Sequence, residues 1–195
     1  MKKIFVTNIH PQLKINLRKM EELVVKILKK ESAYIGRGTA RRAPTKFPQR
    51  KSNANIILID DKFMRRLNRK FAKRAGTTDV LSFEMSERIH SGKEDENLFK
   101  ELADPEGVLG EIYINLDQAK KNAQDYKVKF TDEVALLVTH GVLHLLGYDH
   151  KKKSDFLIMR EKEKEYLFQR GRRRSSKSTE GGSASGGTGA LSGRA

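Results

Sequence analysis

The sequence contains no cysteine and no tryptophan. Without cysteine there can be no zinc finger, no thiolate nucleophile and no disulfide, so a tightly held transition metal must be bound by histidine and carboxylate side chains. The chain also has no run near the roughly 18 apolar residues of a membrane span, and residues 1–12 lack the apolar core of a signal peptide. These absences predict a soluble, cytoplasmic protein, not bound to a membrane, whose five histidines are the candidate metal ligands.

Positive charge is in excess. The 195 residues include 40 Lys and Arg against 25 Asp and Glu, a formal net charge of +15. Because a basic surface gains affinity for phosphates by releasing their counterions, a nucleic acid is the first partner to consider. The same charge could also serve solubility alone. The length predicts one domain, since about 150 folded residues can bury about two-thirds of their surface without crosslinks.

Three stretches interrupt the regular patterns. Residues 171–195 are rich in Gly and Ser, which predicts a basic, disordered tail after a domain of residues 1–170. Arg172–Arg174 in this tail could add nonspecific affinity for RNA or have no function. Residues 32–52 hold six Lys or Arg and no acid, which predicts an irregular basic loop. Residues 86–107 hold seven acids against three bases, which predicts an exposed acidic excursion.

Hydrophobic periodicity predicts four strands and five helices. The expected strands are rich in β-branched residues and lie at 3–8, 55–60, 78–85 and 109–115. The expected helices show apolar spacings of three and four residues and lie at 12–30, 61–72, 116–125, 131–146 and 154–170. Because helices and strands alternate imperfectly, the predicted fold class is α+β, a single domain with a four-stranded mixed sheet.

The segment 140–150, HGVLHLLGYDH, is the densest group of chemically active residues. His140 and His144 are four residues apart, so on a helix they share one face. Gly147 can end that helix in the left-handed conformation and return His150 to the same point. Three neutral imidazoles can hold one Zn²⁺ and leave a fourth position for a water whose pKa the metal lowers to about 7. We therefore interpret all three as ligands of one zinc ion.

This spacing equals that of the zincin metalloproteases, HExxHxxGxxH, except that Gly141 stands where they have Glu. That Glu is the general base of peptide hydrolysis, so its absence argues against a metallopeptidase. A glycine inside a helix costs about 1 kcal/mol relative to alanine, which suggests a close neighbour that a side chain would obstruct. A single histidine on an apolar helix is more often structural than a ligand, but three at this spacing reverse that expectation.

The segment 140–150 resembles the signature H-G-x-L-H-L-x-G-Y-D-H of the YbeY family of bacterial and organellar endoribonucleases. Two further segments are similar to strands of that family, TDVLSF at 78–83 and LGEI at 109–112. Taken with the spacing of the helices and strands, the similarity covers residues 3–170.

The resemblance implies a single-domain α+β fold, one Zn²⁺ held by His140, His144 and His150, and metal-dependent hydrolysis of single-stranded RNA. It also implies rRNA and the small ribosomal subunit as partners, with no small-molecule cofactor. The implied biological role is maturation of the 3′ end of 16S rRNA and ribosome quality control.

One position departs from the family pattern. The family places an Arg seven residues before the Asp of TDVLSF, in an N-x-x-[YF]-R context. Here Asn68 and Phe71 fit, but Ala72 stands at the Arg position. Either Lys73 or Arg74 could substitute from a shifted position, and Arg74 is the better candidate because a guanidinium suits bidentate phosphate contacts. Both could equally be solvated charges at a helix end.

Other polar residues carry weaker signals. Asp149 is a candidate catalytic residue that could orient a ligand imidazole or polarise the metal-bound water, although an Asp after a helix is often a turn former. Asp79 and Ser82 could face the cleft. His10 and His90 lie in segments without a partner signal, and we expect both to be structural.

Two function classes remain open on the sequence. The first is a zinc-dependent endoribonuclease in which Lys73, Arg74 and the loop around Arg41 and Arg42 hold the RNA backbone. Either a water or the RNA 2′-hydroxyl could be its nucleophile. The second is a non-catalytic rRNA-binding ribosome-assembly factor with a structural zinc, which the missing Arg at Ala72 favours. The sequence does not predict the oligomeric state.

Overall fold

The computed structural model describes residues 4–36, 53–84, 108–150 and 152–168. Their centre is one mixed sheet of four strands in the order β1-β2-β4-β3. Three strands are parallel, and β3 runs antiparallel to β4. The strands are β1 (Ile4–Asn8), β2 (Asn53–Ile59), β3 (Val80–Glu84) and β4 (Val108–Asn115). The expected α+β class with one four-stranded mixed sheet is confirmed.

Five α-helices and one π-helical turn lie in the described ranges. They are α1 (Leu17–Gly36), α2 (Asp61–Leu67), the π turn η1 (Asn68–Ala72), α5 (Leu116–Asp125), α6 (Phe130–Leu145) and α7 (Lys153–Phe168). None of these helices is long and apolar enough to cross a membrane.

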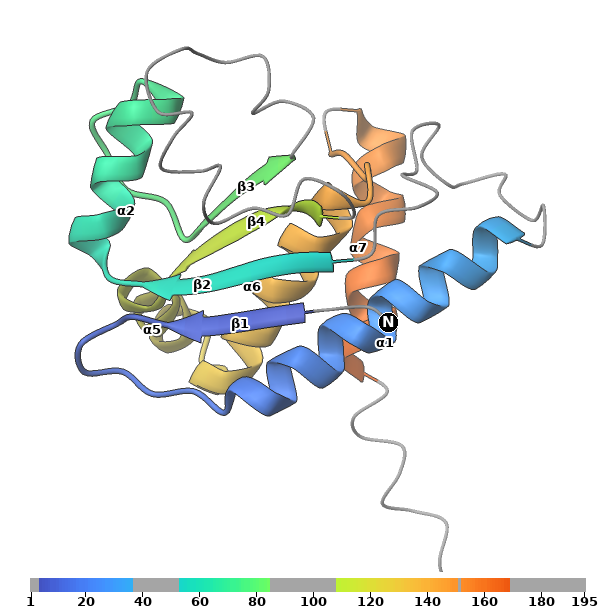
Figure 1. The fold of residues 1–195 in the computed structure, drawn as a ribbon, viewed down its shortest axis with the longest axis horizontal. Helices are drawn as coiled ribbons and strands as arrows, with labels where there is room; N and C mark the ends of the chain where they lie inside the picture. The colour runs from blue at the N-terminus through green and yellow to red at the C-terminus, as the bar shows by residue number, and fades with distance from the viewer. Residues whose placement is uncertain (1–3, 37–52, 85–107, 151, 169–195) are drawn as a thin grey trace, which may run out of the picture.

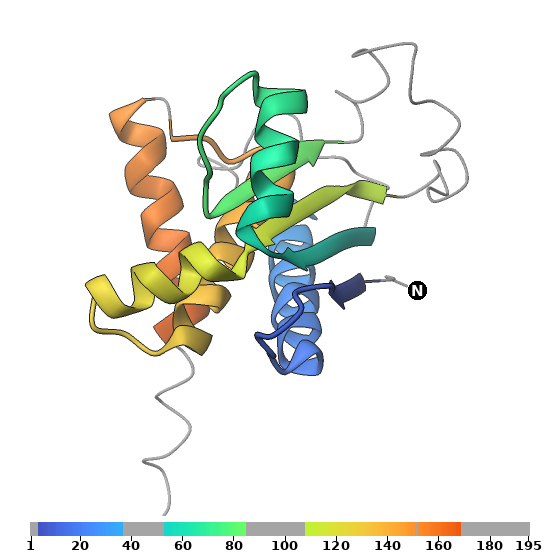
Figure 2. The same cartoon turned by 90° about the vertical axis from the view of Figure 1, so that its left-hand side faces the viewer.

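Helix α6 covers one face of the sheet and forms the centre of the core. It contacts β3, β4, α1, α5 and α7. Figure 1 shows it behind the sheet with α1 and α7 beside it, and Figure 2 shows the same layers from the side. Side chains alternate along a strand, so Ile112 and Ile114 of β4 point to this face and are fully buried. Val138 and Val142 of α6 are fully buried as well.

Helix α2 packs on the opposite face through aromatic rings. Phe63 stacks on Tyr113 of β4 with ring centroids 6.4 Å apart, and Phe71 meets Phe83 of β3 edge to face at 5.1 Å. The other side of α2 is strongly basic. Three pairs of like charges stand four residues apart along α2 and η1: Lys62 with Arg66, Arg65 with Arg69, and Arg66 with Lys70. Each such pair destabilises a helix by about 0.2–0.5 kcal/mol.

The expected helix at 12–30 is wrong at both ends. Residues before Leu17 form a turn because side chains compete for their backbone groups. The Nδ1 atom of His10 accepts from the N–H groups of Gln12 and Leu13, and the side chain of Asn8 donates to the carbonyl of Leu13. Helix α1 then continues to Gly36, so the first five residues of the expected loop at 32–52 are helical.

The remaining expectations differ from the structure by smaller amounts. Helix α5 has the predicted bounds, and β2 and β4 begin one or two residues earlier than expected. The expected helix at 61–72 changes to π geometry at Asn68. The rest of the expected basic loop, the acidic excursion at 86–107 and the expected tail at 171–195 lie outside the described residues.

Two glycines allow the central helix and the strands to approach closely. A Cβ atom at Gly141 of α6 would lie 2.6 Å from Cγ2 of Ile112 and 3.2 Å from Oγ of Ser82. A Cβ atom at Gly110 of β4 would overlap the backbone oxygen of Phe83 and lie 2.7 Å from Cδ2 of Leu145. The expected close neighbour of Gly141 is therefore the sheet itself.

We predict that Gly141→Ala destabilises the protein, although alanine is the better helix former by about 1 kcal/mol. Ile112 is β-branched and fully buried, so its methyl group cannot move aside easily, and overpacking of a core costs about 1–3 kcal/mol. Urea unfolding gives the change in free energy. Gly76→Ala is the matched control, because a Cβ there meets no atom within 4 Å. A more stable Gly141→Ala variant would contradict this account of the packing.

Candidate metal centre and cleft

Helix α6 presents His140 and His144 on one face, as their spacing predicts. The ring centroids are 4.6 Å apart, and the two Nε2 atoms are separated by 3.1 Å. Two imidazole nitrogens bound to one tetrahedral zinc at about 2.0–2.1 Å would be roughly 3.3 Å apart. Both rings are half-buried and lie near the C-terminal end of α6, the helix at the centre of the core. The pair therefore needs little rearrangement to share an ion.

A glycine turn brings His150 to the same point. Gly147 has a φ of 85°, the left-handed conformation that the sequence predicts. The N–H of Gly147 donates to the carbonyl of His144, and the N–H of Tyr148 donates to the carbonyl of Leu143. This is a Schellman ending, which stops the helix and reverses the chain. The ring of His150 then lies 5.7 Å from that of His140 and 5.0 Å from that of His144.

The three histidines together fit a single metal ion. One nitrogen from each imidazole lies within 4.8 Å of the other two, and the described part of the chain holds no second group of this kind. Burial, followed by repulsion from the neighbouring His140 and His150, lowers the pKa of His144 to about 4. His144 is therefore neutral at pH 7 and keeps a lone pair for a metal.

Glu163 on α7 supports the histidine cluster by a hydrogen bond to His140. This residue was not identified from the sequence. Its Oε1 accepts a hydrogen bond from Nδ1 of His140 at 2.7 Å, and its side chain is 14 % exposed. A carboxylate only accepts, so the ring proton sits on Nδ1 and the Nε2 lone pair faces His144. In the sequence Glu163 lies in the run EKEKE, where it looks like one of several surface ion-pair residues.

A second carboxylate, which is buried, anchors the loop that carries His150. Glu31 of α1 is 1 % exposed, and it accepts hydrogen bonds from the hydroxyls of Tyr148 and Tyr166 and from Nζ of Lys162. Burial raises the pKa of Tyr166, and the Glu31 carboxylate raises it further, so the phenol stays protonated and donates. A buried charge is tolerated only when it is paired in this way. The network joins α1, α7 and the loop between Gly147 and His150.

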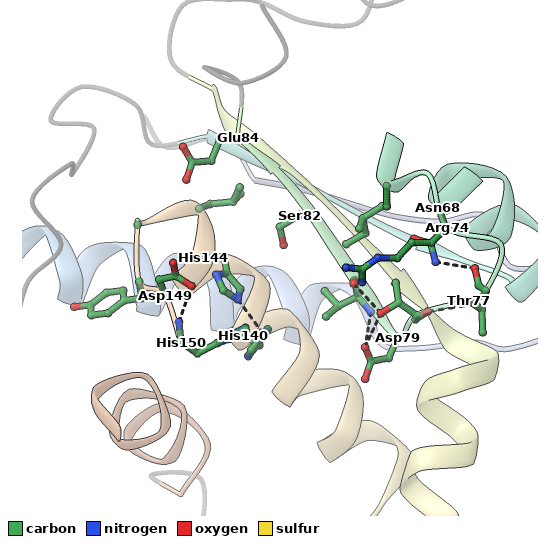
Figure 3. Close-up of a pocket in the computed structure, with 18 residues that line it drawn as sticks. Asn68, Arg74, Thr77, Asp79, Ser82, Glu84, His140, His144, Asp149 and His150 are labelled. Carbon is green, nitrogen blue, oxygen red and sulfur yellow. Dashed lines mark hydrogen bonds between the residues drawn. The ribbon is translucent and has the colours of Figure 1, made fainter. Parts of the chain in front are cut away.

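The histidines form one wall of a cleft of about 830 Å³. The opposite wall is built from the segment after η1 and the start of β3, including Arg74, Thr77, Asp79 and Ser82, as Figure 3 shows. Asn68 holds this wall through two hydrogen bonds. Its side-chain amide donates to the backbone carbonyl of Gly76 at 2.9 Å, and its backbone carbonyl accepts from the backbone N–H of Arg74.

The structure separates the two candidates for the missing family arginine. Arg74 and Ala72 both line the cleft, and the Arg74 side chain in Figure 3 extends into it. Lys73 is not part of this lining in the described chain, and its backbone has a φ of 51°, which turns the chain toward Arg74. Arg74, two residues after Ala72, thus brings a guanidinium to the same cleft.

Asp149 and Asp79 both line the cleft, and both carboxylates also hold the local backbone. Asp149 accepts from the N–H of His150 at 2.7 Å. Asp79 accepts from the N–H of Val80 at 2.9 Å and from the amide of Asn122 at 3.2 Å. Asp149 therefore has the turn-forming contact that the sequence left open, and Asp79 lines the cleft while it also holds the start of β3.

The two remaining histidines differ in what the structure says of them. His10 is 5 % exposed and its Nε2 lies 3.1 Å from Oδ1 of Asp117, so it joins the first loop to α5. This agrees with the structural role that we expected. His90 lies outside the described residues.

We predict that Glu163→Gln weakens metal binding by about 10–100-fold, the usual cost of losing a hydrogen-bond partner of a metal-binding histidine. An amide can offer its NH₂ to Nδ1 of His140, which favours the opposite ring tautomer. Competition with a chromogenic chelator measures the affinity. Glu161→Gln, on the exposed side of the same helix, is the control. Equal affinities of the two variants would show that Glu163 does not set the tautomer.

Comparisons with known proteins agree with the site and the fold. The family model described as "Endoribonuclease YbeY" matches residues 5–171. An endoribonuclease YbeY of Desulforamulus reducens is 34% identical over 170 residues, which are 86% of this chain and 97% of the relative. That of Carboxydothermus hydrogenoformans is 40% identical over 113 residues, 58% of this chain and 68% of the relative.

A solved structure supports the same fold. A Thermotoga maritima protein determined in solution aligns with 92% of this chain and 99% of its own, at a TM-score of 0.50 and 24% identity. With most of the chain matched by the family model and by a relative of nearly the same extent, the chain belongs to the YbeY family of endoribonucleases.

Proposed function

We propose that this protein cleaves single-stranded RNA at one Zn²⁺ ion held by His140, His144 and His150. The observation that carries the proposal is the convergence of three imidazole nitrogens within 4.8 Å at one wall of a cleft whose other wall holds Arg74. A bound zinc ion would supply a Lewis acid that activates water and polarises a phosphoryl oxygen. The absence of a fourth protein ligand in the described chain is typical of a catalytic rather than a structural zinc site.

The protein's own residues hold the substrate and the histidines in place. Arg74 binds a phosphate beside the scissile bond, since its planar guanidinium can donate two parallel hydrogen bonds to phosphate oxygens. Glu163 keeps the proton on Nδ1 of His140, and the hydrogen bond from the backbone N–H of His150 to the Asp149 carboxylate holds the backbone that carries the third imidazole. We therefore assign Asp149 a positioning role, in preference to direct proton transfer.

Gly141 favours this proposal over a metallopeptidase. Position 141 faces the sheet, with Ile112 and Ser82 as the neighbours of any Cβ. A glutamate there would place its Cβ 2.6 Å from Cγ2 of the buried Ile112, so it does not fit unless the helix moves away from the sheet. The general base of the zincins therefore has no place on this helix.

We propose rRNA within the small ribosomal subunit as the substrate, with a role in forming the 3′ end of 16S rRNA and in ribosome quality control. Membership of the YbeY family and the net charge of +15 support an RNA substrate. The chemistry of the product ends identifies the nucleophile, because attack by water leaves an ordinary phosphate whereas attack by the 2′-hydroxyl leaves a 2′,3′-cyclic phosphate.

A second candidate function is RNA binding without catalysis. Ala72 removes the arginine of the family pattern, and a ribosome-assembly factor with a structural zinc needs no such group. Tight RNA binding without turnover by zinc-loaded protein would select this candidate.

We predict that His144→Ala lowers the rate of RNA cleavage by more than about 100-fold, beyond the effect expected for losing a partner of a metal-binding residue. Chelation of wild-type protein should reduce the rate similarly, and added zinc should restore it. Cleavage of a labelled single-stranded RNA measures both. His10→Gln is the control histidine variant, because His10 lies away from the cleft lining. If His144→Ala cleaves at the wild-type rate, the proposed metal mechanism is wrong.

We predict that Arg74→Ala lowers kcat/KM for RNA by about 10–100-fold, as expected for losing a charge-assisted hydrogen bond worth about 1.5–3 kcal/mol. Lys73→Ala, one residue away and outside the cleft lining, should change it by less than threefold. The double variant Ala72→Arg/Arg74→Ala tests whether a guanidinium at the family position restores activity. Equal losses for Arg74→Ala and Lys73→Ala would show that neither residue replaces the family arginine specifically.

A further inference from the structure

One surface outside the cleft has a strongly biased charge. We define the α2 basic face as the exposed side of α2 and η1, made of Lys62, Arg65, Arg66, Arg69 and Lys70. Asp61 is the single acid of these two elements. It pairs with Arg65 at 2.7 Å, whereas Lys62 and Arg69 have no ion-pair partner among the described residues.

Solubility does not explain this arrangement. Helix α7 is also highly charged, but its Lys and Glu alternate, and Lys162 there pairs with Glu31 and Glu165. In α2 the like charges repeat at the spacing that brings neighbours together, which destabilises the helix. A binding partner of opposite charge would remove that repulsion.

The sheet holds the α2 basic face in a fixed orientation. Phe63 and Phe71 anchor the helix on Tyr113 and Phe83, and the guanidinium of Arg66 lies over the Phe63 ring with its carbon 4.8 Å from the ring centre. The charges are therefore presented on a packed element, so a ligand need not order the backbone when it binds.

The face adjoins the cleft at η1. Asn68 and Ala72 of η1 line the cleft from one side of the same turns that carry Arg69 and Lys70 on the other. At 1.5 Å per residue, the α-helical residues from Lys62 to Leu67 extend about 7.5 Å along the axis, and η1 continues the face to Ala72. A strand that leaves the cleft past Arg74 meets this face next.

We propose that the α2 basic face binds the RNA backbone on one side of the cleavage site, through phosphates and without reading the base sequence. The proposal rests on the proposed function, because it places the same RNA substrate outside the cleft. Such contacts add affinity for RNA that extends beyond the cleft and make the binding more dependent on salt. They contribute nothing to an RNA short enough to lie within the cleft.

The test compares two triple variants in a full-length His144→Ala background, which keeps the RNA intact. The first triple variant, on the α2 basic face, is Lys62→Ala/Arg66→Ala/Arg69→Ala. A double variant, Lys62→Gln/Arg69→Gln, is added as a milder change that keeps Arg66 on Phe63. The control, Lys14→Ala/Lys19→Ala/Lys29→Ala, removes three exposed lysines on or next to α1. Fluorescence anisotropy measures binding of single-stranded RNAs of about 5 and about 20 nucleotides over a range of salt concentrations, and circular dichroism checks the fold.

Each contact to a single strand contributes about 0.7 to the slope of log K against log salt, so the first variant should lose about 2 from the slope for the long RNA. Its affinity for the short RNA should match that of the parent, and the control should keep the full slope. The proposal is overturned if the α2 variants and the control bind the long RNA equally, or if the short RNA loses as much as the long one.

Failure of the proposed function gives a different pattern. In that case the protein with His144 intact and zinc bound leaves both RNAs uncut, whatever the salt slopes are. If the protein does not cleave RNA but the α2 variants still lose the expected salt slope, the α2 basic face binds RNA and only the proposed function is wrong. If the protein cleaves RNA but the α2 variants keep the full salt slope, only the proposal for the α2 basic face is wrong.

Discussion

The close approach of α6 to the sheet at Gly141 is the constraint on which the site depends. Without a Cβ at this position the helix rests directly on Ile112 of β4 and beside Ser82 of β3. The neighbouring His140 therefore lies at the edge of the sheet, where the cleft opens against Asp79 and Ser82. The same contact leaves no room for a side chain at the position of the zincin glutamate, so one packing requirement both positions His140 and separates the site from the peptidases with the same histidine spacing.

Two carboxylates, Glu163, which is partly buried, and Glu31, which is fully buried, hold the histidine cluster from behind. Glu163 of α7 fixes the ring of His140, and Glu31 of α1 fixes Tyr148, two residues before His150. Each carboxylate has partners that offset its desolvation, and each lies on a different helix packed around α6 or its end. The low pKa of His144 has the same origin, because the burial that packs α6 also disfavours a charged imidazole. Scaffold and site are thus stabilised by the same contacts.

The sequence predicted those parts of the molecule that depend on local pattern. Strand and helix identity, the left-handed Gly147 and the convergence of His140, His144 and His150 all follow from spacing and turn chemistry. What it could not predict depends on long-range packing. Glu163 and Glu31 look like surface charges in the sequence, since nothing local reveals that α7 and α1 turn them inward. The start of α1 was misplaced because the side chains of Asn8 and His10 hold a turn that apolar periodicity ignores.

The proposed function requires that His140, His144 and His150 hold one metal ion in the cleft. Metal analysis by mass spectrometry, on full-length protein purified without added metal, tests it most directly when wild type and the double variant His140→Ala/His144→Ala are compared. We expect one equivalent of zinc in the wild-type protein and less than a tenth of an equivalent in the variant, with the same fold by circular dichroism. One equivalent in both proteins, or a wild-type protein that retains no metal even after incubation with zinc and removal of the excess, would contradict it.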